Sequence, residues 1–113
     1  MFDELITRIL AFRDARDWKQ FHSPKNLAGS IVIESAELLE TLQWSSDATM
    51  TADVEANRTD IGRELADIVI YCLLMAHETG VDLEAAIRAK LQENDSKYPE
   101  DKARGRSDKY THL

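Results

Sequence analysis

The sequence is poor in cysteine, proline and glycine, and each scarcity excludes a class of protein. The single Cys72 rules out a disulfide within the chain and fits a reducing compartment. Two prolines and four glycines supply too few turns for a β-sandwich or barrel. The longest apolar run, residues 68–76, is too short to span a bilayer, and no signal peptide is visible. We therefore expect an all-α, cytoplasmic protein with no membrane partner.

Positive charge is also in short supply. The chain has 14 Lys and Arg against 21 Asp and Glu, which gives a formal net charge of −7. A groove for nucleic acid depends on clustered Lys and Arg, so we expect no nucleic-acid partner. A phosphorylated small molecule remains compatible with this charge if metal ions bridge the two negative partners. The 113 residues are enough for one domain with a modest core.

Helical periodicity dominates what the sequence does contain. Four helices are expected: from residue 2 to about 16, from 24 to 43 or 44, from a cap at 59 or 60 to Gly80, and from 83 to about 98. Ser23 and Asp82 are the expected caps of the second and fourth. Residues 45–59 are polar and predict a loop or a short helical excursion. The tail from about residue 100 is basic, and we expect it to be irregular and part of a single 1–113 domain.

The third expected helix is apolar around its whole circumference over residues 68–76. A helix of this kind belongs at the centre of a fold. One small chain offers too little surface to bury all sides of this helix, which favours a homo-oligomer.

Two acidic motifs interrupt the apolar helices: Glu34-Ser35-Ala36-Glu37 and Glu64-Leu65-Ala66-Asp67. Residues three apart lie on the same side of a helix, so each motif directs two carboxylates one way. Burying them beside Leu and Ile is costly unless their charge is offset, and neither motif contains a basic residue. A hard divalent cation, Mg²⁺, Mn²⁺ or Ca²⁺, is the expected counter-charge. Di-iron sites need Glu-x-x-His pairs, which are missing from both motifs.

The same residues also have simpler structural interpretations than a metal and ligand site. Single helical carboxylates are usually solvated, and we place Glu40, which rotates away from the apolar stripe, on the surface. The presence of two matching motifs favours a binding site. A polar row on the fourth expected helix would either contact phosphate groups or simply form the solvent-exposed edge of that helix: Lys90, Asn94 and Lys97. The aromatics at the ends of the second helix are either core anchors or stacking surfaces for a base: Trp18, Phe21 and Trp44. His22 would donate to a ligand or satisfy a loop.

The acidic motifs belong to a longer pattern that covers nearly the whole chain. Its stretches are Arg16–His22, Pro24–Leu27, Glu34–Leu38 with Gln43-Trp44, Glu64–Tyr71, Val81–Leu83, Lys90 with Asn94, Tyr98-Pro99 and Lys109–Thr111. This pattern resembles the MazG-like all-α nucleoside triphosphate pyrophosphohydrolases, most closely their dCTP pyrophosphatase branch. It departs at Ile9, where some members of the branch have a histidine that contacts substrate.

The resemblance implies a four-helix-bundle-like, oligomeric fold, a dimer or tetramer, that hydrolyses a nucleoside triphosphate to the monophosphate and pyrophosphate. Mg²⁺, with Mn²⁺ as an alternative, would be held by Glu34, Glu37, Glu64 and Asp67. The nucleoside pocket would consist of Trp18, His22, Trp44 and Tyr71. The residues facing the phosphates would be Lys90, Asn94 and Lys97.

The chemistry of the motifs supports part of this mechanism without the resemblance. Metal ions would orient the triphosphate and lower the pKa of an attacking water. One carboxylate would accept the water's proton, and Glu37 and Glu64 are our catalytic candidates, although the sequence does not choose among the four. Two other hypotheses stay open: a non-catalytic nucleotide-sensing or helical interaction module, and a carboxylate-bridged redox-metal protein, which the missing histidines weaken.

Overall fold

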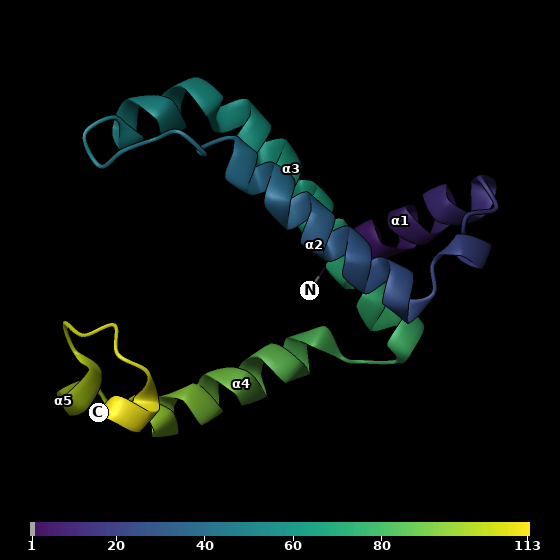
Figure 1. Ribbon diagram of the computed structural model, residues 1–113. Coiled ribbons are helices and arrows are strands. Elements are labelled where there is room, and N and C mark those ends of the chain that lie inside the picture. The colour runs from purple at the N-terminus through teal and green to yellow at the C-terminus, as the bar shows by residue number, and fades with distance from the viewer. Residues whose placement is uncertain (1) are drawn as a thin grey trace. The chain divides into compact units, whose positions relative to one another are not determined.

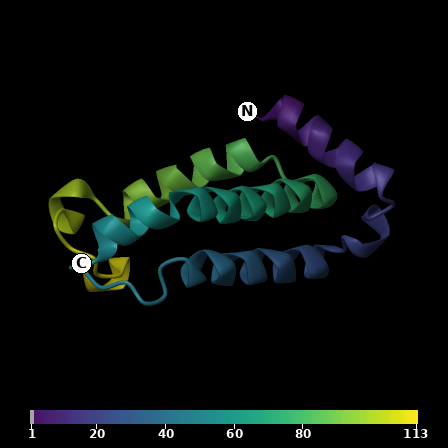
Figure 2. The same ribbon diagram turned by 90° about the horizontal axis from the view of Figure 1, so that it is seen from above.

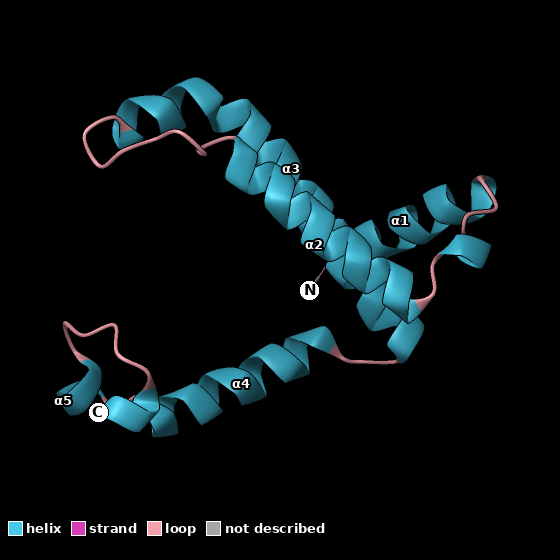
Figure 3. Ribbon diagram, viewed as in Figure 1, coloured by secondary structure: helices cyan, strands magenta, loops and turns pink. Residues whose placement is uncertain are grey.

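Every regular element in the computed structural model, which describes residues 2–113, is a helix (Figure 3). The order along the chain is α1 (Asp3–Ala15), the 3-10 turn η1 (Lys19–Phe21), α2 (Pro24–Glu40), α3 (Met50–Thr79), α4 (Leu83–Lys97), α5 (Glu100–Ala103) and the 3-10 turn η2 (Tyr110–His112) (Figure 1). The all-α prediction is confirmed. Within these residues no helix has the length and apolar character needed to cross a bilayer.

The chain divides into two compact units, Met1–Gly80 and Val81–Leu113. The first contains α1, α2 and α3, and therefore both acidic motifs. The second contains α4, α5 and η2, with the predicted lysine row on α4.

In the first unit, α2 and α3 run antiparallel side by side, and α1 packs against α3 (Figures 1 and 2). The buried hydrophobic side chains among the described residues are Leu27 of α2 and Leu73 and Leu74 of α3. Each contributes about 1.5–3 kcal/mol by leaving water. This small core lies near the start of α2 and the end of α3, because an antiparallel pair brings those two ends together.

The predicted caps Ser23 and Asp82 and the predicted helix end at Gly80 are confirmed. The Ser23 hydroxyl accepts from the Asn26 amide at 3.2 Å, and Pro24 follows it at the first helical position. A carboxylate oxygen of Asp82 accepts from the Ala85 amide at 3.1 Å. Gly80 ends α3 with φ 71°, a left-handed conformation that glycine adopts without steric cost.

The predicted start of the third helix is wrong by about ten residues. α3 begins at Met50, and a turn held by the Thr49 hydroxyl, which accepts from the Ser46 amide at 2.9 Å, precedes it. Residues 50–59 look polar, but they include the good helix formers Ala, Glu, Met and Arg. Glu55 and Arg58 form an ion pair at 3.6 Å within this extension.

The predicted end of the second helix is also wrong, because α2 ends at Glu40 instead of residue 43 or 44. The Thr41 hydroxyl turns back to donate to the Leu38 carbonyl at 2.7 Å. Asn57 of α3 donates its side-chain amide to the Thr41 carbonyl at 3.0 Å. These two bonds replace helical continuation with a tertiary connection, which periodicity alone does not reveal.

The tail is ordered where we expected an irregular segment. Residues 100–103 form α5 and residues 110–112 form η2. Tyr110 explains much of this order: its ring meets that of Tyr98 edge to face at 6.0 Å between centroids, and the Lys97 ammonium lies 4.8 Å from its centroid. Arg106 adds a bond to Asp108 at 3.1 Å.

Candidate active site

Three carboxylates converge where α2 faces α3. Glu34 and Glu37 project from α2 and Glu64 from α3, and one oxygen of each lies within 4.8 Å of the others. The i, i+3 spacing places the first two on one side of α2, and the antiparallel pairing brings the third opposite them. The structure thus gathers three of the four predicted metal ligands into a single cluster.

Electrostatic strain marks the same cluster. Burial, followed by the neighbouring Glu37 carboxylate, raises the pKa of Glu34 from 4.5 to about 7. Burial and Glu37 also raise the pKa of Glu64 above its ordinary value. In the described part of the chain, Oε2 of Glu34 and Oε2 of Glu64 are buried without a hydrogen-bond partner. A divalent cation with oxygen ligands would satisfy both atoms and relieve the repulsion, so this donor set fits a hard metal ion.

Asp67, the fourth predicted ligand, lies one turn beyond Glu64 on α3 and is exposed. It stands outside the tight group of three, but its charge contributes to the raised pKa values of Glu34 and Glu64. Asp67 also lines a cavity between α1 and α3. Asp67 therefore links the acidic cluster to this cavity.

That cavity has a volume of about 750 Å³, within the usual range of roughly 300–1,000 Å³ for small-molecule sites. Its walls include three residues predicted for a nucleoside pocket: Trp18, His22 and Tyr71. The His22 and Tyr71 rings meet edge to face with centroids 6.5 Å apart. His22 Nδ1 is buried and, among the described residues, has no hydrogen-bond partner. The cavity thus combines aromatic faces, an unsatisfied polar atom and an acidic edge.

The position of Trp18 follows from the way α1 ends. Asp17 has φ 54°, and its amide donates to the Asp14 carbonyl at 3.1 Å. The Trp18 amide donates to the Arg13 carbonyl, also at 3.1 Å, and the Trp18 ring meets Phe12 edge to face at 5.7 Å. This is a Schellman helix end with its usual apolar contact. It uses aspartate, with φ 54°, where glycine is commoner.

Trp44 and three residues of α4 are the remaining predicted substrate contacts. Trp44 follows α2 with 88% of its surface exposed, outside the aromatic cavity. Lys90, Asn94 and Lys97 belong to α4, in the second unit, and both lysine ammonium groups pair with Oε1 of Glu93, at 3.3 and 2.7 Å. For these four residues a substrate contact stays a prediction.

Several residues at the site were not predicted from the sequence. Glu40, assigned to the surface, is exposed, yet it lines a polar hollow of about 420 Å³ together with Glu37, Glu64 and Asp60. Helical spacing contained this signal, because Glu40 follows Glu37 by three residues and Asp60 precedes Glu64 by four. Arg13, buried in the wall of the aromatic cavity, gave no signal at all.

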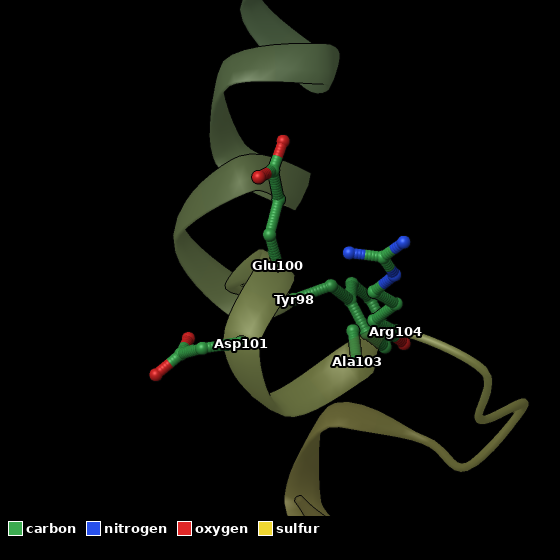
Figure 4. Close-up of a pocket in the computed structure, with 5 residues that line it drawn as sticks. All are labelled: Tyr98, Glu100, Asp101, Ala103 and Arg104. Atoms are coloured by element: carbon green, nitrogen blue, oxygen red, sulfur yellow. The ribbon is translucent and has the colours of Figure 1, made fainter.

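A further hollow of about 680 Å³ lies within the second unit, around Tyr98, Ala103 and Arg104 (Figure 4). Its two carboxylates, on Glu100 and Asp101, point in different directions. They do not converge as those between α2 and α3 do, so this hollow lacks the arrangement that marks the candidate site.

The chain is similar to known proteins in both sequence and fold. The model of the MazG-like family matches residues 30–113. The dCTP pyrophosphatase 1 of Rattus norvegicus is 40% identical and that of Homo sapiens 39%, each over 113 residues that cover 97% of this chain. The chain spans 66% of the length of these two relatives. A crystal structure of a pyrophosphatase from Archaeoglobus fulgidus superposes with a TM-score of 0.84 at 38% identity, covering 87% of this chain and 92% of that one.

Proposed function

The chain belongs to the MazG-like family, and from this premise we propose that it hydrolyses a nucleoside triphosphate between the α and β phosphates, releasing the monophosphate and pyrophosphate. We propose dCTP or a related pyrimidine nucleotide as the substrate, in keeping with relatives named dCTP pyrophosphatase 1. Clearing such nucleotides from the pool is the expected role. The observation that carries the proposal is the acidic cluster of Glu34, Glu37 and Glu64, which Asp67 joins to an aromatic cavity.

The metal ligands in this proposal are Glu34, Glu37, Glu64 and Asp67, and the ion is Mg²⁺, with Mn²⁺ as an alternative. The buried, unpartnered oxygens of Glu34 and Glu64 support this assignment. When bound, the ion supplies charge neutralisation for the triphosphate and a lowered pKa for a nearby water.

Glu37 and Glu64 are the proposed proton acceptors. Both line the open polar hollow beside the cluster, where a water molecule can approach them, whereas Glu34 does not line it. A positioned carboxylate that accepts the water's proton contributes about 10²–10⁴-fold to such reactions. The hollow therefore gives the attacking water a side from which to enter.

The aromatic cavity is the proposed nucleoside pocket. Trp18 and Tyr71 offer ring faces for stacking, worth about 1–3 kcal/mol per base. The buried Nδ1 of His22 offers a hydrogen bond to a polar edge of the base. Trp44 is a further proposed base contact, and the proposed phosphate contacts are Lys90, Asn94 and Lys97.

We propose that the protein works as a homo-oligomer, a dimer or tetramer, in which both compact units belong to one domain. Val32 and Leu39 of α2 are 69% and 67% exposed, so this helix presents apolar surface that a second chain would cover. The small core of a single chain supports the same proposal.

The test is a panel of nucleoside triphosphates with Mg²⁺, in which monophosphate and pyrophosphate are measured together. Both products should appear in equal amounts, and turnover should vanish in EDTA and in Glu64→Ala. Glu55→Ala, which removes an exposed carboxylate from the same helix, should keep full activity. Nucleotide binding without turnover would instead support a sensing module, and an equal, metal-independent background for every nucleotide would refute the proposal.

A further inference from the structure

We propose that Arg13 is a positioning residue for nucleoside recognition: it fixes the α1 wall of the aromatic cavity, and Trp18 with it, against α3. This inference rests on the proposed function, because it gives the cavity a nucleotide to recognise. The residue stands apart from the carboxylates that would carry the chemistry.

Arg13 is the buried charged residue of the described chain, with only 5% of its surface exposed. Burying a charge is costly unless it is paired, and here the pairing is twofold. Nε and Nη2 both lie 2.8 Å from one carboxylate oxygen of Asp14, and Nη1 lies 3.9 Å from Glu78. Since Glu78 is in the last turn of α3, the guanidinium joins α1 to the end of that helix.

The backbone of the same residue holds Trp18. The Arg13 carbonyl accepts from the Trp18 amide at 3.1 Å, in the Schellman end of α1. One residue therefore fixes Trp18 through its carbonyl and α3 through its guanidinium. Tyr71, which also lines the cavity, belongs to α3, so the position of Trp18 relative to Tyr71 depends on this connection between α1 and α3.

Packing alone does not require a cation at this position. An unbranched apolar side chain would fill the space of the arginine stem, but it would leave Glu78 without its partner. Lysine would keep the charge and lose the planar fork that reaches Asp14 and Glu78 together. The arrangement thus uses the geometry of the guanidinium as well as its charge.

The test compares Arg13→Met and Arg13→Lys with Arg58→Met, a matched control that removes an exposed arginine of α3 whose partner is Glu55. With Mg²⁺ and dCTP, Arg13→Met should raise KM about tenfold, because a stacking wall is displaced, while kcat changes by less than about threefold. Arg13→Lys should fall between Arg13→Met and the wild type, and the control should match the wild type.

A second readout follows Trp18 directly. In a Trp44→Phe background, where Trp18 is the remaining tryptophan, Arg13→Met should shift the emission maximum to longer wavelength. Should Arg13→Met fail to fold, Glu78→Gln removes the α3 partner with almost no change in volume, and it should raise KM in the same direction.

Three results would overturn the proposal: an unchanged KM in folded Arg13→Met, a loss of kcat with KM constant, or an unshifted Trp18 emission. Failure of the proposed function looks different, because the wild type itself would then hydrolyse no nucleotide. In that case the Trp18 emission alone decides whether Arg13 positions the wall.

Discussion

Replacing Glu34 with glutamine removes one of the three converging carboxylates while keeping the shape of the side chain. Without metal, burial and the neighbouring carboxylates raise the pKa of Glu34 from 4.5 to about 7. Below about pH 4.5 the group is neutral in both the folded and the unfolded chain. As the pH rises toward 7 the unfolded chain releases this proton more readily, so folding stability is lost across that interval.

The size of the effect follows from the pKa values. The difference between 4.5 and about 7 corresponds to an upper limit of about 3 kcal/mol, at 1.36 kcal/mol per pH unit. Because Glu34 is partly open to solvent, which screens its interactions, we expect about 1–2 kcal/mol. In the metal-free protein Glu34→Gln should be more stable than the wild type at pH 8 by this amount, and the two should converge at pH 4, below the pKa of the group in the unfolded chain.

Urea unfolding in EDTA at pH 4 and pH 8, followed by circular dichroism, measures this difference. The histidines are common to both proteins, so the comparison reports Glu34 and its coupling to the neighbouring carboxylates. Saturating Mg²⁺ should reverse the order at pH 8, since an ion at 100 times its Kd stabilises the wild type by about 2.7 kcal/mol. Glu55→Gln is the control and should follow the wild type throughout. If metal-free Glu34→Gln were the less stable protein at pH 8, the electrostatic account of the cluster would be wrong.

Three further predictions concern the fold around the site. Leu27→Ala, at a position only 1% exposed, should lower the free energy of unfolding by about 2–5 kcal/mol, and a loss under 1 kcal/mol in urea melts would contradict the core described here. Asp17→Val, at φ 54°, should cost about 1–2 kcal/mol by the same measurement, whereas Asp17→Gly should cost nothing; the reverse order would exclude the left-handed helix end. Val32→Glu places a charge on the exposed apolar face of α2, so the molar mass from light scattering should shift toward that of the monomer. An unchanged mass would show that this face takes no part in assembly.

The sequence predicted what depends on local chemistry. Ser23, Gly80 and Asp82 mark helix ends because their side chains, or the lack of one, determine the local backbone, and all three are where we expected. The carboxylates of Glu34, Glu37 and Glu64 converge because helical spacing and antiparallel pairing together leave them little other choice. These features require no knowledge of distant contacts.

What sequence reasoning missed depends on tertiary contacts. α2 stops at Glu40 because Asn57, sixteen residues beyond Thr41, takes up the Thr41 carbonyl. The buried charge of Arg13 is paired in part with Glu78, in the last turn of another helix. Neither pairing leaves a periodic trace in the sequence. Residues 50–59 are polar, which favours a loop, but they also include good helix formers and are helical in the structure.

Because α3 is continuous, it fixes the distance between the acidic cluster and Tyr71. The helix has 30 residues without a break, and Glu64, Asp67 and Tyr71 all project from it. Seven residues separate the first from the last, about 10 Å along the axis at 1.5 Å per residue. That spacing is set by backbone hydrogen bonds and not by flexible loops, so the interval between the acidic end and the aromatic wall is constant. In the proposed site, a nucleotide that contacts both the carboxylates and Tyr71 would have to match this fixed distance. One whose reacting phosphate lies at another distance from its base could not contact both.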